Sequence, residues 1–183
     1  MTLHIRLASP VDYAAIEQIE NAADRLLIDW LTPQLWEPAP SGASRAADAG
    51  YILVAEKTKG SAVIGFVHVL ERDQIAHLEQ LSVLPEHGRR GHGRALVEAA
   101  KKEARRRGYQ WLSLRTYANV PWNGPFYAGA GFVETKPATN FHKQLEKAEE
   151  RLGLALYGRR IQMTAALQQF RSERASLGDE SSK

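Results

Sequence analysis

The segment PEHGRRGHGRAL, residues 85–96, concentrates three glycines, three arginines and two histidines in twelve positions. It follows an apolar run that is typical of a strand and precedes a pattern that is typical of a helix. Glycines allow the backbone of such a turn to approach a ligand closely, and the free N–H groups at a helix start attract anions. Arginines add charge-assisted hydrogen-bond donors. These residue types in this order predict a loop that binds a phosphate-bearing ligand.

Two kinds of phosphate loop fit this segment poorly. The dinucleotide-binding fingerprint requires a third glycine where this chain has Leu96. The NTPase loop requires a lysine and a hydroxyl-bearing residue where this chain has Arg94 and Ala95, and an alanine cannot ligate Mg²⁺. A nucleotide-binding protein of the NTPase type and a plain glycine turn stay open as alternatives.

A third pattern fits better, with a strand that ends in Val-x-Pro and a following Gly-x-Gly. Val83, Pro85, Gly91 and Gly93 occupy its positions. On this pattern the chain resembles the GNAT superfamily of acyl-CoA-dependent N-acyltransferases. The similarity is densest over residues 75–133, where HLEQLSVLPEHGRRGHGRALVEAA and PWNGPFYAGAGFVE match two family blocks in the same order.

The resemblance implies acetyl-CoA as cosubstrate, with no metal. The family's loop begins with Gln or Arg where this chain has Gly88, and Arg89 follows one position later. In the family, the strand before the loop separates from its neighbour, and its backbone binds the pantetheine arm while one amide, here that of Val83, faces the thioester oxygen. Asn123, or Asn119 instead, would contact the same arm. The residues expected to bind coenzyme A are Leu81, Ser82, Val83, Arg89, Arg90, Gly91, His92, Gly93, Arg94, Ala95 and Asn123.

The same resemblance implies catalytic roles for three side chains. An alkylammonium has a pKa near 10.4, so the acceptor amine must lose a proton before it attacks. Strand alternation predicts that His77, Glu79, Leu81 and Val83 share one face, and Glu79 and His77 lie where the family places bases. Tyr127 lies where the family places the acid that protonates the departing thiolate. The alternatives are that Glu79 orients a cationic acceptor, that His77 is a surface residue and that Tyr127 only packs.

These groups require a sheet with helices on its faces. The sequence predicts strands over residues 4–9, 51–56, 63–70, 75–83, 111–116 and 160–167, and helices that begin near residue 12 or cover 91–107, part of 123–132, and 141–152. A long loop is predicted from residue 31 to 50, with a helical turn near Ser44 to Ala47. The expected fold is α/β, a single GNAT-like domain with a mixed, mostly antiparallel sheet that splays after its central strand and is flanked by helices.

Composition sets the remaining limits. The 183-residue chain has no cysteine, so disulfides, thiolate zinc sites and a cysteine nucleophile are excluded. Its formal net charge is +3. No stretch approaches the roughly 18 apolar residues of a membrane span. We expect a cytoplasmic protein that binds neither nucleic acid nor membranes, with a GNAT domain over residues 1–168 and a polar, flexible tail over residues 169–183.

The acceptor is less constrained than the cosubstrate. Trp36, Glu37, Asp48 and Trp122 give the predicted acceptor region an aromatic and slightly acidic character, which is compatible with a cationic amine. The sequence predicts acetyl transfer by direct attack of a primary amine, with a small-molecule amine favoured and a protein amine still open. A monomer and a homodimer are both compatible with the chain, and a non-catalytic CoA-binding module is a further alternative.

Overall fold

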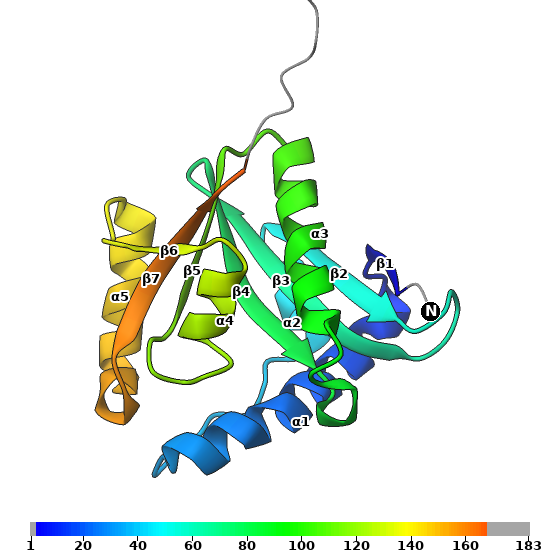
Figure 1. Ribbon diagram of the computed structural model, residues 1–183, viewed down its shortest axis with the longest axis horizontal. Coiled ribbons are helices and arrows are strands. Elements are labelled where there is room, and N and C mark those ends of the chain that lie inside the picture. The colour runs from blue at the N-terminus through cyan, green and yellow to red at the C-terminus, as the bar shows by residue number, and fades with distance from the viewer. Residues whose placement is uncertain (1–2, 168–183) are drawn as a thin grey trace, which may run out of the picture.

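One twisted sheet runs through the molecule (Figure 1). The computed structural model describes residues 3–167, and within them the sheet has seven strands in the order β1-β2-β3-β4-β5-β7-β6. All neighbouring strands are antiparallel except β4 and β5, which are parallel. The strands are β1 (His4–Leu7), β2 (Gly50–Glu56), β3 (Val63–Arg72), β4 (Ile75–Val83), β5 (Trp111–Tyr117), β6 (Val133–Thr135) and β7 (Arg160–Ala166). The predicted α/β class with a mixed, mostly antiparallel sheet is confirmed.

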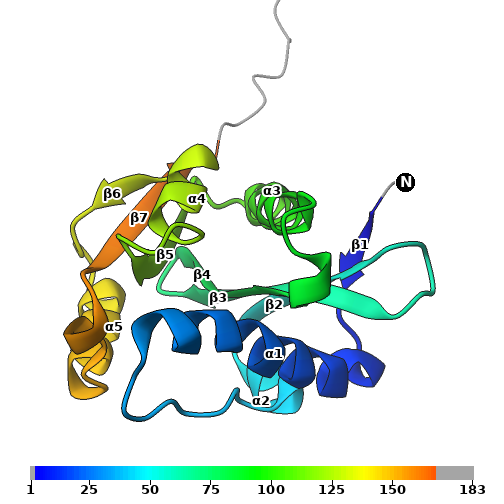
Figure 2. The same cartoon turned by 60° about the horizontal axis from the view of Figure 1, so that its bottom comes forward.

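Helices cover both faces of this sheet (Figure 2). They are α1 (Tyr13–Leu31), α2 (Gly42–Ala47), α3 (His92–Arg106), α4 (Gly124–Gly129) and α5 (Asn140–Arg151). Helices α3 and α4 lie on one face, and α1, α2 and α5 lie on the other. Short 3₁₀ turns at Pro10–Asp12, Pro85–His87 and Leu154–Tyr157 complete the connections.

Helix α3 packs on the sheet through small and aliphatic side chains. Leu96, Val97, Ala100 and Ala104 recur at helical spacing and are fully buried. Tyr51 of β2 donates a hydrogen bond from its hydroxyl to the carbonyl of Ala100 at 2.8 Å. Burial of this face fixes the start of α3, and therefore the loop before it, relative to the central strands.

The sheet opens between its two parallel strands. Strands β4 and β5 pair only over Ala76–Leu78 and Leu112–Leu114. In the described part of the chain, residues 80–83 of β4 pair with β3 and leave their other edge unpaired with β5. The predicted splay after the central strand is therefore present, and it lies directly before the glycine-rich loop.

A β-bulge in β4 alters the predicted orientation of its side chains. Val69 pairs with Leu78 and His68 pairs with Gln80, so Glu79 is an extra residue that reverses the alternation. Leu81 and Val83 consequently pack into the core under α3, whereas His77 lies on the face that carries α5. The prediction that His77, Glu79, Leu81 and Val83 share one face is wrong for this reason.

Other departures from the predicted elements are small. The 31–50 region contains α2, close to the predicted turn, and strand β6 was missed because its three residues are mostly exposed and carry no periodic pattern. Helix α1 continues to Leu31 and ends where Thr32 adopts a left-handed φ of 46° before Pro33. The predicted tail, residues 169–183, lies outside the described residues, and the boundary at residue 168 stays a prediction.

Candidate active site

The loop before α3 has a backbone shape suited to anions. Arg89 has a φ of 57° and Gly91 a φ of 81°, both in the left-handed region. Gly91 caps α3, and a Cβ there would meet nothing within 4 Å, so the glycine is required by its φ and not by crowding. The first helical hydrogen bond runs from the Ala95 N–H to the Gly91 carbonyl at 3.0 Å, which leaves the preceding N–H groups pointing out of the helix end.

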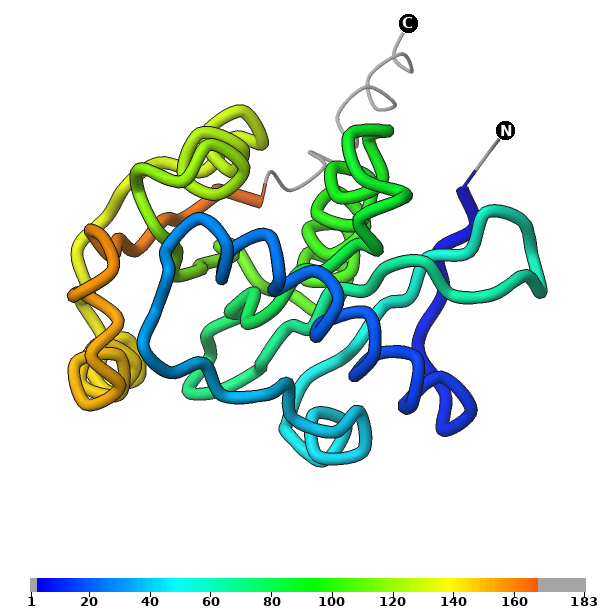
Figure 3. Tube along the Cα trace, turned by 90° about the horizontal axis from the view of Figure 1, so that it is seen from below, coloured from blue at the N-terminus to red at the C-terminus, as the bar shows by residue number. Residues whose placement is uncertain are grey.

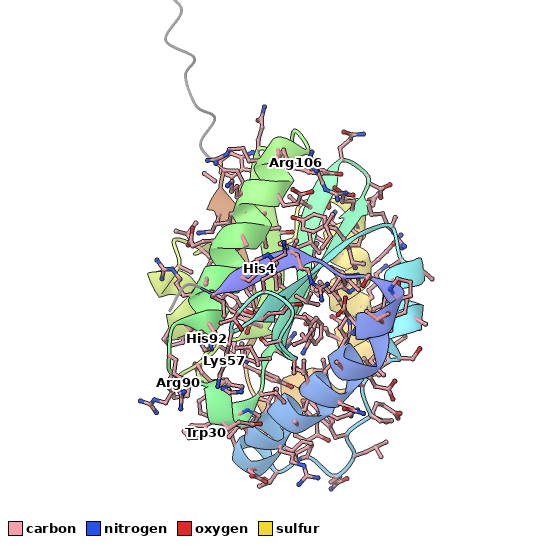
Figure 4. The ribbon with its side chains drawn as sticks, turned by 90° about the vertical axis from the view of Figure 1, so that its right-hand side faces the viewer. His4, Trp30, Lys57, Arg90, His92 and Arg106 are labelled. Atoms are coloured by element: carbon pink, nitrogen blue, oxygen red, sulfur yellow. The ribbon has the colours of Figure 1, made fainter. Side chains whose placement is uncertain are left out.

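Positive side chains surround this loop on one face of the molecule (Figure 4). Arg89 and Arg90 are exposed, and Lys57 from the turn between β2 and β3 lies beside Arg90 and His92. Burial, Lys57 and Arg90 all lower the pKa of the neighbouring His87. Sequence reasoning missed Lys57 because only the fold brings the β2–β3 turn to this loop.

The Arg94 side chain contacts the end of α4, and its role in binding coenzyme A stays a prediction. Its guanidinium donates to the carbonyl of Gly129 at 2.6 Å and pairs with Glu98 at 3.2 Å. Lys101 likewise donates to the carbonyl of Ala130, one residue farther along. Both cations join α3 to the end of α4, and they thereby fix the helix that carries Tyr127.

Tyr127 is buried between two aromatic rings on the α3 face of the sheet. Its ring makes T-shaped contacts with Phe126 and Phe132, at centroid distances of 5.0 and 5.7 Å. Burial raises the pKa of Tyr127 above its usual value, so the phenol keeps its proton at neutral pH. Phe126 also lies 3.6 Å from the position of a Cβ on Gly93, which places α4 directly beside the loop.

Asn123 stands immediately before α4, where it is half-buried and makes no capping hydrogen bond with its side chain. Asn119 is exposed on the preceding loop. Gly124 packs so closely on this loop that a Cβ would lie 2.6 Å from the carbonyl oxygen of Ala118. Of the two asparagines, the structure therefore holds Asn123 closer to the helix of Tyr127.

Glu79 projects from the bulge into the opening on the opposite face. Its side chain is 39% exposed, yet burial raises its pKa above the ordinary glutamate value, with Arg45 opposing this effect. His77, which precedes it on the same face, is 2% exposed and is thus not the surface residue considered as an alternative. Burial lowers the pKa of His77 to about 3, so its imidazole is neutral at physiological pH.

A cluster of carboxylates on α1, unrecognised in the sequence, lies on this same face. Glu20 is buried and pairs with Arg45 of α2 at 2.5 Å. Burial raises the pKa of Glu20 to about 7, against the opposing effect of Arg45, and burial also raises the pKa of Asp24. Asp24 accepts a hydrogen bond from the indole N–H of Trp36 at 3.0 Å. The helical spacing of Glu20 and Asp24 was the available signal, but it also fits a solvated helix face.

The other wall of the opening is charge-balanced. Glu149 of α5 lies between Arg115 of β5, at 2.8 Å, and Arg160 of β7. Although burial opposes the change, hydrogen bonds from Arg160 and Arg115 lower the pKa of Glu149. The carboxylates of Glu20 and Asp24 on α1, which we call the α1 wall, are balanced differently. Among the described contacts, Arg45 is the one cation that offsets their negative charge.

Two tryptophans meet where the end of α1 approaches the loop after β5. Trp30 at the end of α1 and Trp122 after β5 form a T-shaped contact at a centroid distance of 5.3 Å. Both rings remain partly exposed, at 55% and 41%. The end of α1 thus reaches across the sheet to the loop that follows β5 (Figure 3). The unpaired part of β4, the carboxylates of α1 and these two rings form the candidate site.

Among residues 3–167, no helix is long and apolar enough to cross a membrane. In the same range, no three His, Asp or Glu side chains gather in a group that could hold a metal ion. The expectations of a metal-free reaction and of a cytoplasmic location stay predictions.

Comparisons with known proteins give a family match and several similar folds. Residues 48–134 match a family described as acetyltransferase (GNAT) domain. The fold is similar to that of the ribosomal-protein-S18-alanine N-acetyltransferase from Escherichia coli, with 21% identity and a TM-score of 0.65 over 94% of this chain and 99% of that one. It is also similar to the PaiA N-acetyltransferase from Thermoplasma acidophilum, solved with coenzyme A, with 17% identity and a TM-score of 0.60 over 91% and 99% of the two chains. Nourseothricin acetyltransferase shows 24% identity and a TM-score of 0.62 over 92% and 100%.

Proposed function

Because the chain carries an acetyltransferase domain of the GNAT family, as its sequence predicts, we propose that it transfers the acetyl group of acetyl-CoA to a primary amine. One observation carries the proposal. The unpaired edge of β4 leads directly into an anion-binding loop, with Glu79 on one side of the sheet and Tyr127 on the other. A thioester held along that edge would lie between a base and an acid.

The cosubstrate would be held mainly by backbone. The pyrophosphate would bind the free N–H groups at the start of α3, with Arg89, Arg90 and Lys57 adding positive charge. The pantetheine arm would lie along Leu81–Val83, where β4 has left β5. The Val83 N–H would stabilise the oxyanion that forms during transfer.

Transfer then requires three proton movements. The ammonium of the acceptor gives a proton to Glu79, and the free amine nitrogen attacks the thioester carbon. As the tetrahedral intermediate collapses, the C–S bond breaks and Tyr127 gives its proton to the thiolate. The nitrogen, which became cationic on attack, loses its second proton to solvent. Solvent also returns a proton to the Tyr127 phenolate and takes up the proton held by Glu79.

The α1 wall supports a cationic acceptor. Glu20, Asp24 and Glu79 all have pKa values raised by burial, which means that a nearby positive charge would stabilise their ionised forms. Trp30 and Trp122 add aromatic faces that attract an ammonium group. Because the two rings close one side of the opening, we favour a small-molecule amine over a protein terminus.

A thiol-release assay with acetyl-CoA and a panel of amines tests this function. The panel contains small diamines, amino acids, aminoglycoside-like amines and a peptide with N-terminal alanine. We expect turnover with at least one small cationic amine, acetyl-CoA binding that persists in EDTA, and much slower turnover of Glu79→Gln at neutral pH, where little of the amine is unprotonated. Binding without turnover across the panel would instead indicate a CoA-binding module, and binding lost on chelation would indicate a metal-dependent nucleotide site.

A further inference from the structure

Four polar side chains form a row on the sheet face that carries α5. The row begins at Glu79, whose Oε2 lies 3.9 Å from Nε2 of His77. Nδ1 of His77 lies 2.9 Å from Oγ of Ser113 on β5, and the same Oγ lies 3.0 Å from Nε2 of His142 on α5. His77, Ser113 and His142 are all at least nine-tenths buried.

The local sequence holds each member of the row in place. Ser113 is fixed by the parallel pairing of β5 with β4, in which it lies opposite His77. His142 lies in the first turn of α5, where its N–H donates to the hydroxyl of Thr139 at 3.2 Å. Phe141 packs edge-on against the His77 ring at 5.5 Å and excludes water from that side.

Three acceptors compete for the single hydrogen of the Ser113 hydroxyl. They are Nδ1 of His77 at 2.9 Å, Nε2 of His142 at 3.0 Å and the carbonyl of Ala76 at 3.3 Å. The shortest of these contacts is the one with His77. A neutral imidazole carries one N–H, so if Ser113 donates to Nδ1 of His77, the hydrogen of His77 must be on Nε2, the nitrogen that faces Glu79. His142 then donates from its Nε2 to Ser113, and its buried Nδ1, which has no partner among the described residues, carries no hydrogen.

We infer that His77 is a positioning residue, whose imidazole Ser113 and His142 hold as the Nε2–H tautomer so that it donates toward Glu79 and keeps that carboxylate ionised. The distance of 3.9 Å is too long for a hydrogen bond, so the inference requires a rotation of the Glu79 side chain, which is 39% exposed, toward Nε2 of His77. His77 would act through Glu79 and would not touch the acceptor. The inference rests on the proposed role of Glu79 as base.

The other charges that face Glu79 do not explain its ionisation by themselves. They are Glu20 on α1, Arg45 on α2, Asp48 after α2, Glu149 on α5 and Arg160 on β7. Three of these are acids, and both arginines are already paired with carboxylates. A neutral donor beside Glu79 stabilises its anion without adding a charge that would repel a cationic acceptor.

Nuclear magnetic resonance of the isotopically labelled full-length chain tests the inference without an acceptor. The ¹⁵N shifts of the His77 ring report its tautomer, and we expect Nε2–H at a pH where Glu79 is ionised. The carboxyl ¹³C shift of Glu79 reports its titration. In His77→Leu, and to a smaller extent in Ser113→Ala, the titration should move upward by about one pH unit, because a donor to the anion is lost.

Two further variants control for structural effects. Thr164 lies opposite Ser113 on β7 and bonds Thr135 instead of the row, so Thr164→Val removes a nearby hydroxyl and should leave the Glu79 titration unchanged. Ser113→Thr keeps the hydroxyl and should preserve the wild-type value. An Nδ1–H tautomer in the wild type, or equal Glu79 titrations in wild type and Ser113→Ala, would overturn the inference. Failure of the proposed function would appear separately, as absent thiol release by the wild type.

Discussion

Glu79 and Tyr127 approach the opening of the sheet from opposite faces. Glu79 projects from the bulge toward α1 and α5, whereas Tyr127 is buried among the side chains beneath α3. An acid and a base separated in this way can serve one reaction when the reacting carbon lies between them. The bulge therefore matters chemically, because it places Glu79 on the face opposite Leu81 and Val83, whose backbone borders the opening.

The role of Tyr127 is tested by removing its hydroxyl alone. In Tyr127→Phe we expect kcat to fall by about 10²-fold, with the KM for acetyl-CoA nearly unchanged, because the proton is needed only as charge develops on sulfur. Steady-state kinetics measures both. Tyr127→Ala should in addition lower stability by about 3–5 kcal/mol, since a buried aromatic ring is lost. A Phe variant with wild-type turnover would leave Tyr127 as a packing residue.

The pH dependence of kcat/KM tests whether Glu79 acts as the general base. Burial raises the pKa of Glu79, so the wild-type value should fall as pH drops through a range above that of an ordinary glutamate. Above this pH range kcat/KM of the wild type should level off, because ionised Glu79 deprotonates the bound ammonium. In Glu79→Gln only the free amine reacts, so kcat/KM should keep rising about tenfold per pH unit toward the amine pKa. Parallel profiles in the two proteins would exclude Glu79 as the base.

At the scale of elements, the loop before α3 depends on its backbone conformation. In Gly91→Asp we expect acetyl-CoA binding to weaken by at least about 10²-fold, because a negative charge is placed where the pyrophosphate is proposed to bind and the left-handed φ becomes strained. Isothermal titration calorimetry measures the affinity.

The other end of the same helix provides the control for Gly91. Gly108 has a φ of 95°, and a Cβ there, like one on Gly91, would have nothing within 4 Å of it. Gly108→Asp should therefore carry a similar backbone cost while acetyl-CoA binding stays close to wild type. Equal affinities in the two variants would remove the loop from the cosubstrate site.

Sequence patterns predicted most elements because those elements are local. Alternation, helical spacing and glycine positions gave every strand but β6, as well as α3 and the loop that includes Gly91. The bulge at Glu79 was not predictable, since it depends on pairing with β3. The pairing of Glu20 with Arg45 and the contact of Trp30 with Trp122 likewise join segments far apart in the chain. The residues expected to bind coenzyme A could therefore be proposed from the sequence. The residues of the α1 wall could be identified only once the fold was known.

For the molecule as a whole, the two substrates would use different sides of the sheet. The loop proposed to bind the cosubstrate continues into α3, and the α1 wall lies on the opposite face. Trp30→Ala should therefore raise the KM for the amine several-fold and leave the KM for acetyl-CoA unchanged. Two-substrate kinetics checks this separation. Trp111→Ala is the matched control, because Trp111 is similarly exposed at 59% but lies at the paired end of β5. A change in both constants would contradict separate sites.

The short pairing between β4 and β5 also has a consequence for cooperativity. Strands β1–β4 and β5–β7 form two antiparallel halves, and the backbone seam between them spans three residue pairs. Few hydrogen bonds must break for this seam to open, so amide hydrogen exchange should be faster along it than within either half. A pantetheine arm along Leu81–Val83 would occupy the place of a missing strand and couple the halves. The cosubstrate would then be a structural component of the sheet as well as the source of the acetyl group, and its departure would loosen the seam between the two halves.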